Sequence, residues 1–130
     1  NLFNEKNNGE SILNLIDKGY VKSAHDISLG GLLVAISKMC IKGNKGIKIN
    51  KSKNLINEIE YFFAEDQGRY LIEVNREDLK EVTKILNKNS VHHEELGIIT
   101  QNDMIINEKT KVTIDELKSY YTSWLSNYMS

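Results

Sequence analysis

The sequence predicts an α+β fold, a layered mixed sheet with flanking helices, for this chain of 130 residues. Segments with the alternation of strands are mixed with helical patterns in irregular order, and two short strands near the C-terminus flank a polar turn. No repeat of solenoid length and no low-complexity linker interrupts the pattern. The length suits a single domain over residues 1–130, and the opening Asn1 leads us to expect a piece of a longer chain.

The first helix is predicted in "GESILNLIDKGYV". Ser11 is placed to cap its start, and Gly19 follows Lys18 as a stop. The apolar residues recur at helical spacing; they are Ile12, Leu13, Leu15 and Ile16. The next segment, "VKSAHDI", predicts a strand that enters a loop.

A second helix is predicted directly after two glycines, in "GLLVAISKMCIKG", with Gly43 closing it. Its expected buried side consists of Leu32, Leu33, Ile36, Met39 and Cys40. Cys40 is the only cysteine, so it can form no internal disulfide and lacks the companions of a structural zinc site. We expect a buried thiol that behaves as a small hydrophobic residue.

The middle of the chain predicts two strands around a short helix. "KGIKIN" alternates like an edge strand, with Ile47 and Ile49 on one face. In the following segment a short helix is expected around Leu55, Ile56 and Ile59. A strand with Tyr70, Ile72 and Val74 then follows the "EDQG" turn.

The last third of the sequence predicts a helix, a hairpin of two strands and a closing helix. "REDLKEVTKILNKN" is amphipathic, and "ELGIIT" and "DMIINE" are short strands that "QND" joins as a hairpin. The inward residues of the first of these helices are Leu79, Val82, Ile85 and Leu86. Thr113 and Glu116 form a capping box at the start of the closing helix. Its apolar side, expected in the core or an interface, carries Leu117, Tyr120, Tyr121, Trp124 and Leu125.

Composition argues against several partners. The formal net charge is -1 and the lysines form no basic stripe, so no nucleic acid partner is expected. The longest apolar run, around Leu32 to Ile36, is far shorter than a membrane span, and no signal segment opens the chain. We therefore expect a cytoplasmic protein without a membrane partner.

The stretch "SAHDISLGG" carries the clearest candidate site. Gly30 and Gly31 have no side chains, so the backbone N–H groups at the start of the helix could face an anion. Asp26 could hold Mg²⁺, and the hydroxyl of Ser28 could donate a hydrogen bond to a phosphate oxygen. The same residues also suit a plain turn with a cap, which is the commoner arrangement. His25 has the pKa range of a general base, but no nucleophile is placed for it, and a structural role is favoured.

Two further groups have simple interpretations. His92 and His93 are adjacent, so on a strand they would point to opposite faces and could not share a metal; a solvated loop pair is expected. Glu65, Asp66 and Arg69 suggest either a charged binding loop or a turn with a local ion pair.

The residues resemble a known family. "SAHDISLGGLLVAISKM", followed by "FFAEDQGRYLIEV" and "ELGIIT", is similar to the C-terminal end of phosphoribosylformylglycinamidine synthase. That family has a His-Asp-x-Ser-Asp/Glu-Gly-Gly-Leu motif before the helix and a later Glu-x-x-Gly-Arg motif. Aminoimidazole ribonucleotide (AIR) synthetase and selenophosphate synthetase carry different residues around their glycines. The resemblance implies the AIR synthase C-terminal-domain fold, in the second of two pseudo-equivalent halves.

The resemblance also implies an activity for the whole enzyme. It would be a ligase of purine biosynthesis that converts formylglycinamide ribonucleotide to the amidine with ATP, Mg²⁺ and ammonia from a glutaminase domain or subunit. The catalytic histidines belong to preceding domains, so no catalytic residue is expected in this chain. The fragment is expected to be inactive by itself and to pack on those domains, or to self-associate.

The site residues carried over by resemblance are few. In long members of the family the second half helps to hold an auxiliary ADP and Mg²⁺, which implies Asp26 at the metal and Ser28, Gly30 and Gly31 at the nucleotide. Leu29 stands where the family usually has an acid, so one partner for metal or backbone is missing. Two alternatives remain open: a scaffold that binds no ligand, and another ATP-dependent synthetase or kinase of the superfamily.

Overall fold

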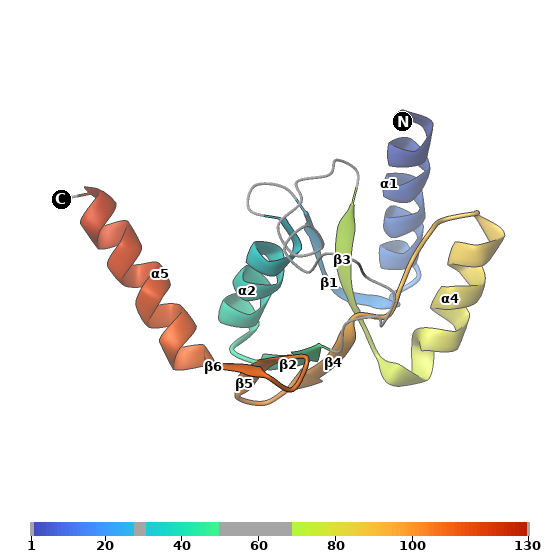
Figure 1. Cartoon of the computed structure of the whole chain (residues 1–130). Coiled ribbons are helices and arrows are strands. Elements are labelled where there is room, and N and C mark those ends of the chain that lie inside the picture. The colour runs from blue at the N-terminus through green and yellow to red at the C-terminus, as the bar shows by residue number, and fades with distance from the viewer. Residues whose placement is uncertain (1, 28–30, 50–68, 130) are drawn as a thin grey trace. The chain divides into compact units, whose positions relative to one another are not determined.

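The computed structural model describes residues 2–27, 31–49 and 69–129 (Figure 1). Helices and strands follow one another in irregular order and include a four-stranded mixed sheet, which confirms the predicted fold class. The elements are α1 (Leu2–Asp17), β1 (Val21–Asp26), α2 (Gly31–Gly43), β2 (Gly46–Ile49), β3 (Tyr70–Val74), the 3₁₀ turn η1 (Arg76–Asp78), α4 (Leu79–Lys88), β4 (Gly97–Thr100), β5 (Asp103–Ile106), β6 (Thr110–Thr113) and α5 (Ile114–Met129). The helix expected around Leu55, Ile56 and Ile59 and the "EDQG" turn lie outside the described residues.

The chain divides into two compact units, residues 1–35 with 62–94 and residues 36–61 with 95–130. In the first unit β1 and β3 form an antiparallel ribbon, in which Ala24 pairs with Ile72 and Asp26 with Tyr70. A small apolar cluster holds α1, α4 and the ribbon together. Its buried members are Leu15, Val82 and Leu86, and the partly buried ones are Tyr20, Val21, Ile72, Val74, Ile85 and Val91. The expectation that residues 1–130 form a single domain stays a prediction.

Helix α1 begins earlier than predicted. It starts at Leu2, so the prediction that Ser11 caps it is wrong. Ser11 is instead buried inside the helix, where its hydroxyl accepts a hydrogen bond of 3.2 Å from the Asn89 side chain. The predicted stop is confirmed, because Gly19 has a φ of 77° and the Tyr20 N–H donates to the Leu15 carbonyl at 3.1 Å, as in a Schellman motif.

Helix α2 ends at Gly43 as predicted, but the left-handed residue that turns the chain is Asn44, with a φ of 52°. Leu32, Ile36 and Cys40 are buried, as expected, and Ala35 joins them. Leu33 and Met39, which are expected on the buried side, are only half-buried, because they lie at the edges of the buried face of α2.

The second unit contains a four-stranded mixed sheet in the order β4-β2-β5-β6. β2 pairs antiparallel with β4 and parallel with β5, so the prediction of an edge strand at β2 is wrong. The predicted β4–β5 hairpin is wrong as well, because β2 lies between these two strands. Alternating apolar residues reveal that a segment is a strand but not which neighbours it will have.

The actual hairpin joins β5 and β6, and the sequence pattern does not predict β6. Asn107 and Glu108 in its turn have φ values of 53° and 60°, and the Lys109 N–H donates to the Ile106 carbonyl at 3.1 Å. Positive φ at both central residues matches the twist of the flanking strands.

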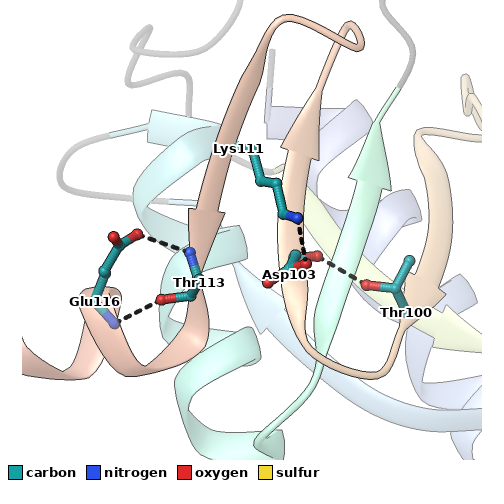
Figure 2. A network of polar contacts seen from close by, with 5 residues as sticks. All are labelled: Thr100, Asp103, Lys111, Thr113 and Glu116. Carbon is teal, nitrogen blue, oxygen red and sulfur yellow. Dashed lines mark hydrogen bonds and ion pairs between the residues drawn. The ribbon is translucent and has the colours of Figure 1, made fainter.

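Helix α5 begins with the predicted capping box. The Glu116 N–H donates to the Thr113 hydroxyl at 3.1 Å, and the Thr113 N–H donates to the Glu116 carboxylate at 3.0 Å (Figure 2). Tyr120 and Tyr121 are 73% and 51% exposed, so they are not part of the core. The side chains of Trp124 and Leu125 lie outside the described residues.

Candidate functional site

The candidate site lies where β1 ends and α2 begins, within the first unit. Asp26 is the last residue of β1, and Gly31 is the first residue of α2. Buried Ile27 fixes the strand end, because its N–H donates to the Arg69 carbonyl at 2.9 Å. The structure thus describes two of the four predicted ligand residues; Ser28 and Gly30 lie outside its described residues, as does Leu29.

The Asp26 side chain faces solvent. Along β1 the residues alternate between half-buried and exposed, and Asp26 falls on the exposed side with 67% of its side chain accessible. A carboxylate at an open strand end is accessible to a hydrated metal ion. Mg²⁺ in nucleotide sites takes one or two carboxylates and keeps several waters, so a single exposed aspartate fits that ion.

His25 lies on the opposite side of the strand. Its ring is 33% exposed, and its Nδ1 stands 3.9 Å from the Asp26 carboxylate, which is ion-pair distance rather than a hydrogen bond. On the same side Ser23 donates a hydrogen bond of 2.9 Å to Glu73 of β3, which ties the two strands together. The structural role of His25 stays a prediction.

The start of α2 is electrostatically suited to an anion. Its first turn contains no acidic residue, so no carboxylate within that turn neutralises the positive end of the helix dipole. Gly31 has a φ of 73°, a conformation that a residue with a Cβ adopts only with strain. The first backbone N–H groups of a helix have no partner within it and can point at a ligand.

The remaining candidates do not form a site. His92 is exposed in the loop after α4, and His93 Nδ1 lies 2.9 Å from the Val91 carbonyl oxygen, so the expected loop pair is confirmed. Within residues 2–27, 31–49 and 69–129, no three metal-ligating side chains cluster. Of the expected charged loop only Arg69 is described. Burial raises the pKa of the Cys40 thiol to about 11, as expected for an inert buried cysteine.

Comparison with known proteins identifies the class of domain. The chain belongs to the family of the C-terminal domain of AIR synthase related proteins, whose model matches residues 1–107.

No helix in the described part of the chain is both long and apolar enough to cross a membrane.

Within that family the predicted resemblance to phosphoribosylformylglycinamidine synthase is confirmed. The chain is 60% identical over 129 residues to subunit PurL of this enzyme from Pelagibacter ubique, covering 99% of this chain and 18% of that protein. It is 37% identical to PurL of Bartonella henselae, covering 96% of this chain and 17% of that protein. The chain therefore spans under a fifth of the length of these relatives.

Solved structures support the same fold. Thermotoga maritima PurL complexed with ATP matches with a TM-score of 0.73 and 20% identity, over 86% of this chain and 21% of that chain. The same protein complexed with FGAR matches with a TM-score of 0.74 and 21% identity, over 87% of this chain and 20% of that one. These neighbours confirm an AIR synthase-like fold.

Proposed function

We propose that this chain serves as the C-terminal domain of a phosphoribosylformylglycinamidine synthase. That enzyme would use ATP and glutamine-derived ammonia to convert formylglycinamide ribonucleotide to the amidine in purine biosynthesis. The proposal is supported by the "SAHDISLGG" motif and by the likeness to PurL over 99% of the chain. The domain would pack on the preceding domains, and a glutaminase domain or subunit would supply the ammonia in the cytoplasm.

The domain's own contribution would be an auxiliary nucleotide site at the β1–α2 junction. The solvent-facing carboxylate of Asp26, at the end of the strand that precedes a helix start without acidic residues, is the observation that carries this assignment. Asp26 would hold Mg²⁺, and Ser28, Gly30 and Gly31 would hold the phosphates of ADP or ATP. Bound Mg²⁺ would neutralise phosphate charge there. PurL of T. maritima is known in complexes with ATP and with ADP, which supports nucleotide binding by an enzyme of this kind.

The proposal that this domain carries no catalytic groups can be tested by measuring turnover. The chain of 130 residues, supplied with formylglycinamide ribonucleotide, ATP, Mg²⁺ and ammonia, should form no amidine, because the catalytic groups would lie in other domains. The full-length enzyme should form it under the same conditions. Amidine formation by the 130-residue chain alone would refute its role as a non-catalytic domain.

A second candidate function is a scaffold that binds no ligand. It is favoured by the shallow surface of the described residues, whose best-defined hollows are lined by residues of α4 and of α5 and do not include Asp26. The two functions differ in one property, since only the first requires Mg²⁺-dependent nucleotide binding that is sensitive to Asp26.

A further inference from the structure

The first half of α1 contains three adjacent residues that disfavour a helix. Asn7, Asn8 and Gly9 follow one another inside this element. Asparagine has a low helix propensity, and glycine loses more backbone freedom in a helix than any other residue. Most of the stability of a helix in a protein comes from its tertiary contacts. The first half of α1 therefore depends on its contacts with the neighbouring elements to stay helical.

Two hydrogen bonds hold this half of α1 to the end of α4, which lies beside it (Figure 1). The Asn7 side chain donates at 2.8 Å to the backbone carbonyl of Asn89, the residue that caps α4. Carbonyls at a helix C-terminus lack a partner within the helix, and Asn7 supplies one. The Asn89 side chain in turn donates at 3.2 Å to the buried hydroxyl of Ser11. These two bonds, here called the Asn89 clamp, lie on either side of Asn8 and Gly9.

Asn8 and Gly9 form the only Asn-Gly pair of the sequence. In a flexible Asn-Gly pair the backbone nitrogen of the glycine can attack the side-chain carbonyl carbon of the asparagine, because no side chain on the glycine hinders it. The new N–C bond closes a five-membered succinimide ring. The side-chain amide leaves as ammonia and takes up the proton of the glycine nitrogen. Water then opens the ring to give aspartate or isoaspartate.

We propose that Asn8 is a deamidation site that the Asn89 clamp keeps closed. In an α-helix the N–H of residue 9 donates to the carbonyl four residues earlier, and the helical dihedral angles keep its nitrogen from reaching the side-chain carbonyl carbon of Asn8. Deamidation therefore requires this half of α1 to open, and its rate reports the open fraction. Isoaspartate lengthens the backbone by a methylene group, so it would displace Ser11 from Asn89 and prevent α1 from closing in the same register.

Peptide mapping by mass spectrometry tests this site in the full-length enzyme, incubated at mildly alkaline pH. The enzyme unfolded in urea provides the reference rate. The folded enzyme should convert Asn8 at least about tenfold more slowly than the unfolded one. Asn89→Ala leaves the buried Ser11 hydroxyl without its donor and should speed the conversion in the folded enzyme about tenfold. Equal rates in the folded and unfolded enzyme, or no conversion of Asn8 in either, would overturn the proposal.

Asn75→Ala is the matched control for a general loss of stability. It removes a side-chain hydrogen bond of 3.4 Å to Asp78 at the other end of α4. The conversion of Asn8 should keep the wild-type rate in this variant, because the Asn89 clamp is intact. Conversion that is no faster in Asn89→Ala than in Asn75→Ala would overturn the proposal.

Gly9→Ala tests the chemistry of the site. A Cβ on Gly9 would meet the Tyr70 hydroxyl at 3.6 Å, which is ordinary van der Waals contact, so α1 can accept it. The methyl group hinders the attacking nitrogen and raises the helix propensity. Conversion of Asn8 should therefore become much slower than in the wild type, both in the folded enzyme and in urea. An unchanged rate in urea would show that the reaction does not pass through the succinimide and would overturn the proposal.

Discussion

Gly46 lies directly against the backbone of Asp103, and a Cβ on Gly46 would overlap the Asp103 carbonyl group. Gly46 is the first residue of β2, and Asp103 is the first residue of β5, its parallel neighbour. The short link from β4 to β5 passes this point, so a residue without a side chain allows β2 to lie between them.

Gly46→Ala should therefore destabilise the chain by about 1–3 kcal/mol or more, because backbone must move to admit the methyl group. Urea unfolding followed by circular dichroism measures the loss. Gly43→Ala is the matched control, since a Cβ there meets nothing within 4 Å. Equal stability of the Gly46→Ala and wild-type chains would contradict the close crossing.

Two leucines of α1 should respond very differently to truncation. Leu15 is 0% exposed in the apolar cluster, whereas Leu13 is 62% exposed. Leu15→Ala should cost about 2–5 kcal/mol, and Leu13→Ala should change stability by less than about 0.5 kcal/mol. Denaturant unfolding of both variants checks the packing of α1, and equal losses would show that α1 packs through another face.

Cys40 should make stability depend on pH at the alkaline end. Burial raises its pKa from 9.0 to about 11, so the folded chain favours the protonated thiol. This contribution is fully present below pH 9 and is lost as the pH rises through 11. Unfolding measured from pH 8 to beyond 11 should show a decline that is smaller in Cys40→Ala. Identical pH profiles for the two chains would mean that the thiol is not buried.

Leu29 offers a gain-of-function test of the nucleotide site. Leu29→Asp restores the acid that the family usually has there, and it should tighten Mg²⁺-dependent ADP binding about tenfold by supporting the metal. Leu29→Asn, of the same shape but uncharged, is the control and should show little gain. Calorimetry on the full-length enzyme measures both. Equal affinities of the Asp and Asn variants would remove any role for a carboxylate at this position.

Local chemistry was predictable from the sequence, and strand order was not. The capping box of Thr113 and Glu116 and the turn at Gly19 depend on residues a few positions apart, and both are confirmed. The placement of β2 between β4 and β5 depends on a close crossing at Gly46, for which no periodicity provides a signal. Ser11 was mistaken for a cap because its actual partner, Asn89, is distant in sequence.

The positions of Asp26 and Gly31 at element ends were predictable in a similar, local sense. The alternation along β1 places Asp26 at its exposed end, and Gly31 opens the next helix as expected. Cys40 is buried, as a lone cysteine on an apolar helix face indicates. The roles of Ser28 and Gly30 stay predictions, because they rest on the motif alone.

The auxiliary nucleotide site is tested most directly by titrating ADP, with and without Mg²⁺, into the full-length enzyme and its Asp26→Asn variant. The substitution keeps the shape of the side chain and removes the charge that would hold the metal. Asp26→Asn should weaken binding at least about tenfold in Mg²⁺ and leave it unchanged without Mg²⁺. Asp17→Asn, at an exposed position on α1, should bind like the wild type. Unchanged Mg²⁺-dependent affinity in Asp26→Asn would contradict the proposed site.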